Sequence, residues 1–287
     1  MRWIKRLGLA LAGVIVAITA SIYVMAVYVD VIDTKGLNSL SLDMINLLLP
    51  ALQRWAEDAR VVAVFLQGAG EKAFCAGGDV RRICVGVREN GIEDPYAQQF
   101  FTEEYKLDYL IHTFPKPVIV WGQGIVMGGG IGLMCGASHR VVTESSRLAM
   151  PEITIGLYPD VGGSYFLSRL PGRLGLFLGM TGVNLNAGDA LFAGFADHAV
   201  ASARRQAVLE SLAELDWVDD LVGRKAQVSA VLEAEECPGL PASEVQSRLA
   251  LINERAAADD LPTLFAALTA PAPDDAWLDR AARTLAK

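Results

Sequence analysis

The chain has few of the residues that bind metals and no surplus of positive charge. It contains three histidines and four cysteines among 287 residues, with neither a CxxC nor an HxxxH spacing. The sequence therefore predicts no metal site. The chain has 25 lysines and arginines against 33 acidic residues, which gives a net charge of −8. It therefore has no surplus of basic residues to neutralise nucleic-acid phosphates. We expect no nucleic-acid partner.

Motifs for nucleophilic catalysis are also missing. No GxSxG is present, which excludes the nucleophile elbow of the serine hydrolases. Cys75 lies beside a glycine-rich loop, but no histidine is near it in the sequence, so a buried core thiol is the favoured interpretation. The scattered cysteines are typical of a reducing compartment. The remaining candidates for catalysis are carboxylates, namely Glu152, Asp160 and the pair Glu103 and Glu104.

The first 29 residues form an apolar segment. Residues 7–29 carry no charge and follow three basic residues; as a helix this run would be about 35 Å long, against a hydrocarbon core of roughly 30 Å. This pattern favours a membrane-type segment over residues 7 to about 24, with the amino terminus inside. A signal peptide fits less well, because the run exceeds the usual apolar length. Alternatively, residues 23–32, rich in β-branched and aromatic residues, form the first core strand.

The rest of the chain has the pattern of an α/β protein. Hydrophobic residues make up 52% and charged residues 20%, as in a folded domain. Strands are predicted at 61–68, 116–124 and 140–145, and helices at 41–58, from about 80, at 95–114 and after 127. We expect an α/β core over residues 30–200. The composition then predicts a helical C-terminal region, 201–287, with breaks at 237–241 and 269–275.

Two glycine-rich loops each lie between a strand and a helix. Residues 75–79 (CAGGD) and 127–132 (MGGGIG) place unpaired N–H groups at helix N-termini, where together they could form an oxyanion hole. Alternatively, the glycines only permit tight turns. A third interpretation is dinucleotide binding, because residues 122–128 read GxGxxxG and Glu144 follows at the distance of a ribose-binding acid. This spacing departs from the GxGxxG of dinucleotide-binding proteins, so the evidence for dinucleotide binding is weak.

Some of these carboxylates could have a purely structural role, and others are better explained by catalysis. Adjacent helix positions point about 100° apart, so at most one of Glu103 and Glu104 can face a cleft. Asp160 could cap the helix that follows it. Glu152 follows a proline among apolar residues, where burial would raise its pKa and suit it to general acid–base catalysis.

Several motifs together carry a resemblance to a known family. NSLSLDM, KAFCAGGD, GQGIVMGGGIGL, AMPEITIGLYPDVGGSYFLSRLPG and LGLFLGMTG resemble the enoyl-CoA hydratase/isomerase (crotonase) superfamily, and within it the 3-hydroxyisobutyryl-CoA hydrolase branch. The resemblance covers roughly residues 30–200. It implies a crotonase fold, a spiral of ββα units, an acyl-CoA thioester substrate and no separate cofactor. It also implies an oxyanion hole formed by the N–H groups of Gly78 and Gly129.

The same resemblance separates hydrolysis from hydration. Hydratases of this superfamily use two glutamates, at the positions of Gly132 and Glu152, whereas this chain has glycine at the first. The hydrolase branch combines Glu152 with Asp160 for catalysis, and Glu104, Gly129, Glu152 and Asp160 contact the substrate. The resemblance thus implies hydrolysis of 3-hydroxyisobutyryl-CoA or a similar short branched 3-hydroxyacyl-CoA, as in valine catabolism. The alternatives are an enoyl-CoA hydratase or isomerase, and a membrane-tethered acyl-CoA-binding protein with little activity.

The resemblance bears on location and size as well. Acyl-CoA substrates favour a cytoplasmic body, with membrane association through residues 7–29 and oligomerisation left open. Members of the branch continue past the point matching residue 287, so the C-terminal region looks truncated. Lys35, Lys72 and Arg81 are the basic residues near the motifs that could hold the CoA phosphates.

Overall fold

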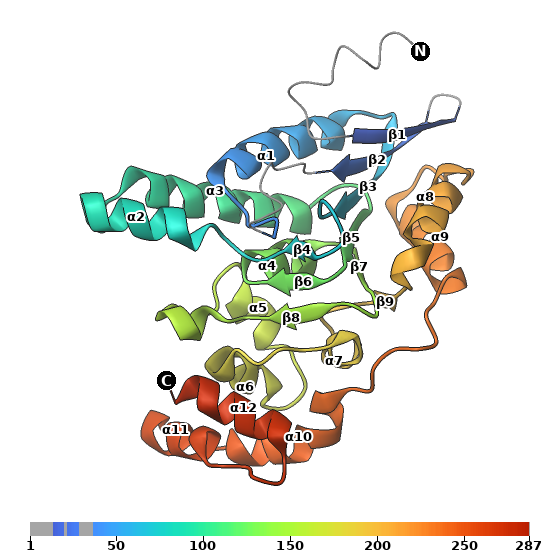
Figure 1. Cartoon of the computed structure of the whole chain (residues 1–287). Helices are drawn as coiled ribbons and strands as arrows, with labels where there is room; N and C mark the ends of the chain where they lie inside the picture. Colours follow the sequence, from blue (N-terminus) through green and yellow to red (C-terminus); the bar gives the residue numbers. More distant parts are fainter. Residues whose placement is uncertain (1–13, 20–21, 29–36, 287) are drawn as a thin grey trace.

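The protein is built around two β-sheets with helices on both sides (Figure 1). The computed structural model describes residues 14–19, 22–28 and 37–286. The larger sheet has the order β1-β2-β3-β5-β7-β9, and the smaller has the order β4-β6-β8. The strands of the larger sheet are β1 (Val14–Thr19), β2 (Ile22–Tyr28), β3 (Val61–Gln67), β5 (Val118–Gly122), β7 (His139–Val142) and β9 (His198–Ala199). Those of the smaller are β4 (Ala73–Cys75), β6 (Ile125–Met127) and β8 (Arg147–Ala149).

From β3 to β9, consecutive strands alternate between the two sheets. β3, β5 and β7 pair in parallel in the larger sheet, and the strand after each of them, β4, β6 and β8, pairs in parallel in the smaller sheet. Each strand pair is followed by helix before the chain returns to the larger sheet. This is the spiral of ββα units, so the predicted fold class is confirmed. The small sheet was not predicted, because its strands are only three residues long and lie within glycine-rich sequence.

Helices account for most of the rest of the described chain. They are α1 (Leu42–Glu57), α2 (Val80–Asn90), α3 (Pro95–His112), α4 (Gly129–Gly136), α5 (Gly163–Leu167), α6 (Leu174–Thr181), α7 (Ala187–Ala193), α8 (Arg205–Ala213), α9 (Leu221–Ala234), α10 (Glu244–Arg255), α11 (Leu261–Thr269) and α12 (Ala276–Leu285). Two 3₁₀ turns, η2 (Glu152–Ile155) and η3 (Ser202–Arg204), complete the set. The predicted break at 237–241 falls between α9 and α10, and the one at 269–275 begins at the last residue of α11 and ends before α12.

Both faces of the larger sheet are covered, which explains why β3 is buried along its whole length. Phe65 and Trp121 stack on one face and pack in a cluster with side chains of α8 and α9. Val64 and Val120 lie in a separate cluster that includes side chains of α1, α3 and α4. Figure 1 shows α8 and α9 on one side of the sheet and α1, α3 and α4 on the other. Alternate strand residues therefore face different helical layers.

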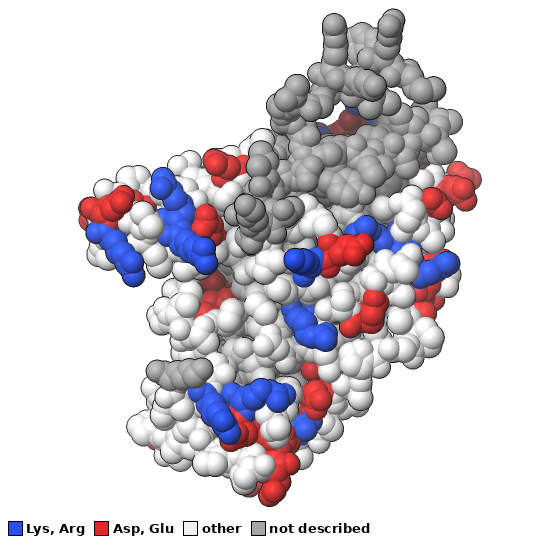
Figure 2. All heavy atoms as spheres, viewed as in Figure 1, with Lys and Arg blue, Asp and Glu red and all other residues white. Residues whose placement is uncertain are grey.

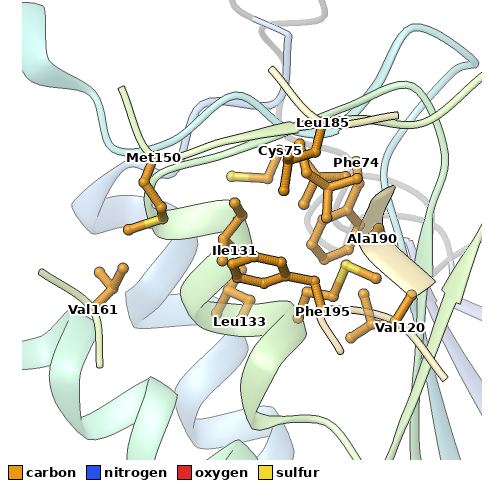
Figure 3. Close-up of a cluster of buried hydrophobic side chains, with 14 of the residues drawn as sticks. Phe74, Cys75, Val120, Ile131, Leu133, Met150, Val161, Leu185, Ala190 and Phe195 are labelled. Atoms are coloured by element: carbon orange, nitrogen blue, oxygen red, sulfur yellow. The ribbon is translucent and has the colours of Figure 1, made fainter. Parts of the chain in front are cut away.

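The second cluster continues from the sheet to the segment around residue 150. Figure 3 shows Ile131 and Leu133 of α4 among Phe74, Leu185 and Phe195. Met150 and Val161 lie at its margin. This packing holds the helix that begins at the second glycine loop against the small sheet.

The apolar N-terminal segment differs from the expected membrane-type helix. Residues 14–19 and 22–28 are the strands β1 and β2, which pair with each other antiparallel, and β2 pairs in parallel with β3. The described sequence VIVAIT and IYVMAVY is rich in β-branched and aromatic residues, which favour strands. The alternative of a core strand beginning near residue 23 therefore agrees with the structure through residue 28. Among the described residues no helix is long and apolar enough to cross a bilayer. Residues 1–13 lie outside the described part of the chain.

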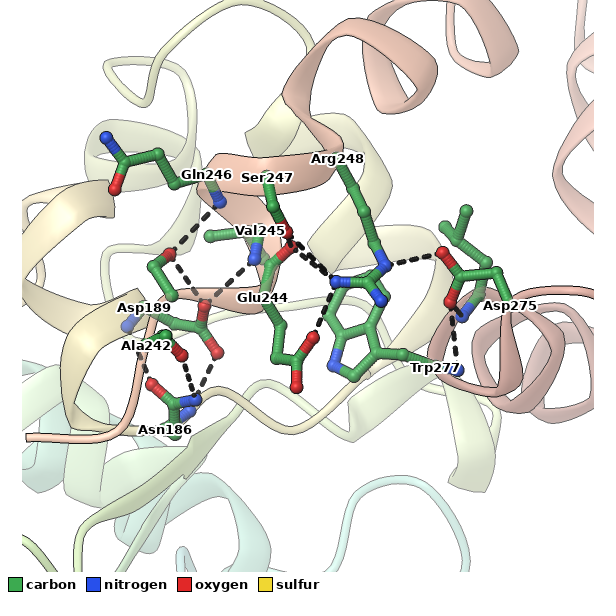
Figure 4. A network of polar contacts seen from close by, with 12 residues as sticks. Asn186, Asp189, Ala242, Glu244, Val245, Gln246, Ser247, Arg248, Asp275 and Trp277 are labelled. Carbon is green, nitrogen blue, oxygen red and sulfur yellow. Dashed lines mark hydrogen bonds and ion pairs between the residues drawn. The ribbon is translucent and has the colours of Figure 1, made fainter.

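Polar contacts join α10 to α7 and to α12 (Figure 4). The buried carboxylate of Asp189 on α7 accepts hydrogen bonds from the Ser243 hydroxyl and the Val245 N–H, at 2.8 and 2.9 Å. Farther along α10, Arg248 pairs with Asp275 at 2.6 Å and lies over the Trp277 ring. These contacts fix the C-terminal helices α10 and α12 to the rest of the protein.

The structure confirms that α1 begins after Ser41, which caps it. The contribution of this cap to stability can be measured. The Ser41 side chain accepts the Met44 N–H at 3.2 Å, and α1 runs to Glu57 with Pro50 inside it. Removing such an N-cap costs about 1 kcal/mol, so Ser41→Ala should lower the free energy of unfolding in urea by about that amount. Asn46→Ala, an exposed change within α1, is the control and should not destabilise. Equal unfolding midpoints for Ser41→Ala and the wild type would contradict the cap's contribution.

Candidate active site

All five residues singled out for the site line one cavity of about 220 Å³. Its walls come from the two glycine loops, from α3 and from the segment 151–161. The five are Gly78, Glu104, Gly129, Glu152 and Asp160. Apolar side chains, including those of Ile83, Phe100 and Leu157, supply much of the remaining wall. The cavity is thus an apolar pocket with three carboxyl groups and two backbone loops converging in it, the composition expected of a ligand site.

The two glycine loops lie side by side at the cavity. A Cβ placed on Gly129 would be 3.5 Å from the Gly78 nitrogen, so the two backbones approach closely. Gly77 and Gly128, which precede them, both have positive φ, 100° and 49°, a conformation that favours glycine. No acceptor for the N–H of Gly78 or Gly129 is found among the described residues. Two free N–H groups therefore converge on the cavity, one of them at the N-terminus of α4.

Glu104 faces the cavity and Glu103 does not, as the helix geometry requires. Glu104 is 2% exposed on α3, whereas Glu103 forms an ion pair with Lys106 at 2.7 Å. Burial, together with the nearby charges of Asp160 and Glu152, raises the pKa of Glu104 to about 8. At neutral pH its carboxyl group is mostly protonated and can donate a hydrogen bond.

Glu152 is the second buried acid. It begins the 3₁₀ turn η2, is 5% exposed, and its Oε2 has no hydrogen-bond partner among the described residues. A Cβ on Gly128 would lie 2.9 Å from Glu152 Oε1, which places this carboxyl group against the second glycine loop. Burial raises its pKa to about 7. A carboxyl group with this pKa exchanges protons readily near neutrality.

Asp160 is not the cap of the helix that follows it. Gly162 is the N-cap of α5, with φ of 84° and no side-chain cap. The Asp160 side chain instead accepts a hydrogen bond from the Tyr105 hydroxyl at 3.3 Å. Burial raises the pKa of Asp160, although this hydrogen bond opposes the shift. The capping interpretation was wrong because two glycines allow the helix to start later, and this leaves the carboxylate free to face the cavity.

The position of the missing second glutamate is filled by other side chains. A Cβ on Gly132 would lie 2.6 Å from Val161 Cβ and 3.2 Å from Asp108 Oδ2. Asp108 was missed in the sequence, although it follows Glu104 by four residues and so lies on the same face of α3. This i, i+4 spacing was the available signal. No room remains for a longer side chain at residue 132 unless Val161 moves.

The rival sites suggested by the sequence are explained structurally. Cys75 is buried, and burial raises the pKa of its thiol to about 12, so it is not a thiolate nucleophile. Glu144 accepts hydrogen bonds from the hydroxyl and, at 2.9 Å, the N–H of Ser202, so it is engaged within the protein. Within the described part of the chain, no cluster of three or more metal-binding side chains occurs.

Of the basic residues suggested for the CoA phosphates, the two that the structure describes, Lys72 and Arg81, do not line the cavity. Lys72 and Arg81 are both exposed, and Lys35 lies outside the described residues. Figure 2 shows basic and acidic side chains interspersed over α2, at the left of the view. The role of Lys72 and Arg81 in phosphate binding stays a prediction.

The similar proteins found by sequence share one enzyme name, whereas the similar solved structures carry several enzyme names. The chain is 46% identical over 200 residues to a mitochondrial 3-hydroxyisobutyryl-CoA hydrolase of Xenopus tropicalis, covering 70% of this chain and 50% of that protein. It is 44% identical over 203 residues to the Homo sapiens protein of the same name, covering 69% and 50%. The chain therefore spans about half the length of the curated relatives it matches.

Solved structures extend the similarity to nearly the whole chain. A carnitinyl-CoA dehydratase from Mycobacterium thermoresistibile matches with a TM-score of 0.79 and 35% identity, over 95% of this chain and 74% of that one. An enoyl-CoA hydratase from Rhodobacter sphaeroides matches with a TM-score of 0.77 and 32% identity, over 95% and 73%. The family model described as enoyl-CoA hydratase/isomerase matches residues 29–287. With its alternating sheets, paired glycine loops and these matches, the chain belongs to the enoyl-CoA hydratase/isomerase family.

Proposed function

We propose that this protein hydrolyses the thioester bond of a short, branched 3-hydroxyacyl-CoA such as 3-hydroxyisobutyryl-CoA. The observation that carries the proposal is the set of acids in the cavity. Glu152, Glu104 and Asp160 converge there, while Val161 and Asp108 fill the place where a hydratase's second glutamate would start. The names of the relatives in the hydrolase branch support the same reaction.

The glycine loops would activate the thioester. We place its carbonyl oxygen between the N–H groups of Gly78 and Gly129, which lack protein acceptors in the described structure. As the carbonyl carbon becomes tetrahedral, negative charge gathers on this oxygen, and the two donors stabilise it more strongly than they stabilise the ground state.

The acids then have distinct tasks set by their pKa values. Ionised Glu152 would take a proton from water as the water attacks the carbonyl carbon, or attack that carbon itself. On either route the C–S bond breaks and the thiolate of CoA accepts a proton, which on the first route is the one that Glu152 took from water. On the second route the acyl group is left on Glu152 as an anhydride, which water hydrolyses to release the carboxylic acid. Asp160, held by Tyr105, would orient the substrate or water and assist the proton transfer. Protonated Glu104 would donate a hydrogen bond to the hydroxyl group of the acyl chain.

A two-substrate comparison tests this proposal against hydration. Purified whole chain is incubated with 3-hydroxyisobutyryl-CoA and a thiol reagent, and separately with crotonyl-CoA. The whole chain is used because β1 and β2, residues 14–28, pair with β3. We expect steady release of free CoA and little hydration. Hydration of crotonyl-CoA without CoA release would instead favour the alternative of an enoyl-CoA hydratase, the name of the similar Rhodobacter sphaeroides protein. Binding without turnover would favour an acyl-CoA-binding protein.

The raised pKa values predict a narrow pH optimum. Glu152 must lose its proton to act, so kcat/KM should rise as the pH passes about 7. Glu104 must keep its proton to donate, so kcat/KM should fall as the pH passes about 8. Because the two carboxyl groups interact, the measured values belong to the pair. Glu104→Gln, which remains a neutral donor, should remove the alkaline fall; a fall that persists in this variant would contradict the assignment.

For location, a cytoplasmic body stays our proposal, because acyl-CoA substrates are found there. The matched relatives are named as mitochondrial proteins. Membrane association, oligomeric state and the independence from a metal or added cofactor likewise stay predictions.

A further inference from the structure

Residues 160–163 form a tight turn that leads from the candidate active site into α5. The Gly163 N–H donates to the Asp160 carbonyl oxygen at 2.5 Å, and the two central residues, Val161 and Gly162, have φ of 41° and 84°. A turn with positive φ at both central residues favours asparagine, aspartate or glycine at the first of them. Valine is therefore an unfavourable residue at this position of the turn.

The backbone of Val161 is strained. Of the non-glycine residues with positive φ in the described part of the chain, which are Leu37, Asn38 and Val161, only Val161 is β-branched. A branched Cβ makes this conformation costly, and such strain persists only where the surrounding structure enforces it. Strained residues gather at functional sites, and Val161 lines the cavity of the candidate active site. The place of the strain indicates a functional role.

Packing against α4 enforces the strained conformation. Val161 is 3% exposed and lies at the margin of the larger buried cluster (Figure 3). A Cβ on Gly132 would be 2.6 Å from Val161 Cβ and 3.0 Å from its Cγ2, so the isopropyl group is pressed against α4 where that helix has no side chain. A change of φ to the usual negative range would move the isopropyl group out of this space.

The orientation of Asp160 depends on the same turn. Its side chain lines the cavity and accepts a hydrogen bond from the Tyr105 hydroxyl at 3.3 Å. Asp160 is the first residue of the turn, and its carbonyl oxygen accepts the hydrogen bond that closes the turn. A change of φ at Val161 would therefore redirect the backbone and the carboxyl group of Asp160.

We propose that Val161 is a positioning residue: its contact with Gly132 holds the strained turn, and the turn directs the Asp160 carboxylate toward Tyr105 and the cavity. This inference rests on the proposed thioester hydrolysis, in which Asp160 orients the substrate or water and assists the proton transfer. Val161 takes no part in the chemistry itself. Because it acts through the placement of Asp160, its loss should slow the reaction more than it weakens substrate binding.

Shortening the valine tests this role. Val161→Ala should lower kcat for CoA release from 3-hydroxyisobutyryl-CoA by about tenfold or more, since a small misplacement of a catalytic group can cost about 10²-fold. KM should change by less than about threefold. Val161→Ile keeps the branched Cβ and should recover most of the loss, to within about threefold of wild type. Val183→Ala, at a half-buried valine outside the cavity, is the control and should match wild type. Equal kcat values for Val161→Ala and wild type, or equal losses in the alanine and isoleucine variants, would overturn the proposal.

The same contact can be disturbed from the α4 side. Gly132→Ala would place a Cβ 2.6 Å from Val161 Cβ, so the valine must move, and kcat should fall by about tenfold. In a Val161→Gly background the colliding atom is absent, and adding Gly132→Ala should cost less than about twofold. A loss by the same factor in both backgrounds would show that Gly132 acts independently of Val161 and would overturn the proposal.

Crystal structures of the wild type and the two Val161 variants give a readout that does not depend on turnover. In Val161→Ala we expect a negative φ at residue 161 and loss of the hydrogen bond between Tyr105 and Asp160. Val161→Ile should keep the positive φ and the hydrogen bond. An unchanged turn in Val161→Ala would overturn the inference, whether or not CoA is released. If the wild type releases no CoA but the turn changes as expected, the proposed reaction is wrong and the structural link between Val161 and Asp160 stands.

Discussion

Glu152→Gln should lower kcat for thioester hydrolysis by at least about 10²-fold, the factor that a positioned general base contributes. The substitution keeps the size of the side chain and removes its ability to take a proton or to attack the thioester. Glu152 is buried, and a Cβ on Gly128 would lie 2.9 Å from its Oε1, so its carboxyl group faces the second glycine loop, where we place the thioester. KM should change much less than kcat, since the interaction lost is one made mainly in the transition state.

A matched control for this variant is Glu103→Gln. Glu103 lies beside Glu104 on α3 but pairs with Lys106 and does not line the cavity of the candidate active site, so its substitution should leave kcat near the wild-type value. Steady-state kinetics with a thiol reagent measures both variants, and circular dichroism checks that both are folded. Activity of Glu152→Gln within a few-fold of wild type would return Glu152 to a structural role.

Gly129→Ala should be nearly as damaging, with a loss of about 10²- to 10³-fold in kcat, as for removal of one oxyanion-hole donor. The alanine Cβ would lie 2.6 Å from Glu104 Oε1, far inside van der Waals contact. Either Glu104 or the loop must therefore move, and both line the cavity of the candidate active site. Gly129 does not have a positive φ, so the expected loss comes from this collision and not from backbone strain.

The control for the glycine variant is Gly179→Ala on α6. Its added Cβ would meet its nearest neighbours at 3.5 and 3.6 Å, which is ordinary contact, and alanine favours a helix. We expect near wild-type kcat for this control. Comparable kcat values for Gly129→Ala and Gly179→Ala would contradict the placement of the thioester oxygen at the glycine loops.

Much of the framework could be predicted from the sequence because it depends on local patterns. Hydrophobic periodicity and the Ser41 cap define α1, and long β-branched runs define β3 and β5. The small sheet could not be predicted in the same way. Its three-residue strands have too few side chains for a period to be read, and their backbones pair with one another across segments distant in the sequence.

The apolar amino terminus shows a limit of the hydrophobicity argument. A run without charge has the same composition whether it crosses a bilayer as a helix or lies in a sheet buried on both faces. Its β-branched residues were the better guide, since the described residues 14–19 and 22–28 are strands that extend the larger sheet.

Motifs in the sequence singled out the residues of the candidate site, but not the side chains that surround them. The sequence suggested Glu104, Glu152 and Asp160, and the structure places all three in one cavity. It could not show that Val161 and Asp108 occupy the space beside Gly132, because these contacts join α3, α4 and the loop before α5. Contacts between segments distant in the sequence leave no periodic signal in any one of them.

The most direct test of thioester hydrolysis follows the oxygen of the attacking water. The whole protein is incubated with 3-hydroxyisobutyryl-CoA in ¹⁸O-labelled water, and the products are analysed by mass spectrometry. The account predicts free CoA together with an equal amount of hydroxy acid that carries the label in its carboxyl group. An intact thioester, or label appearing only on a carbon of the acyl chain, would contradict it.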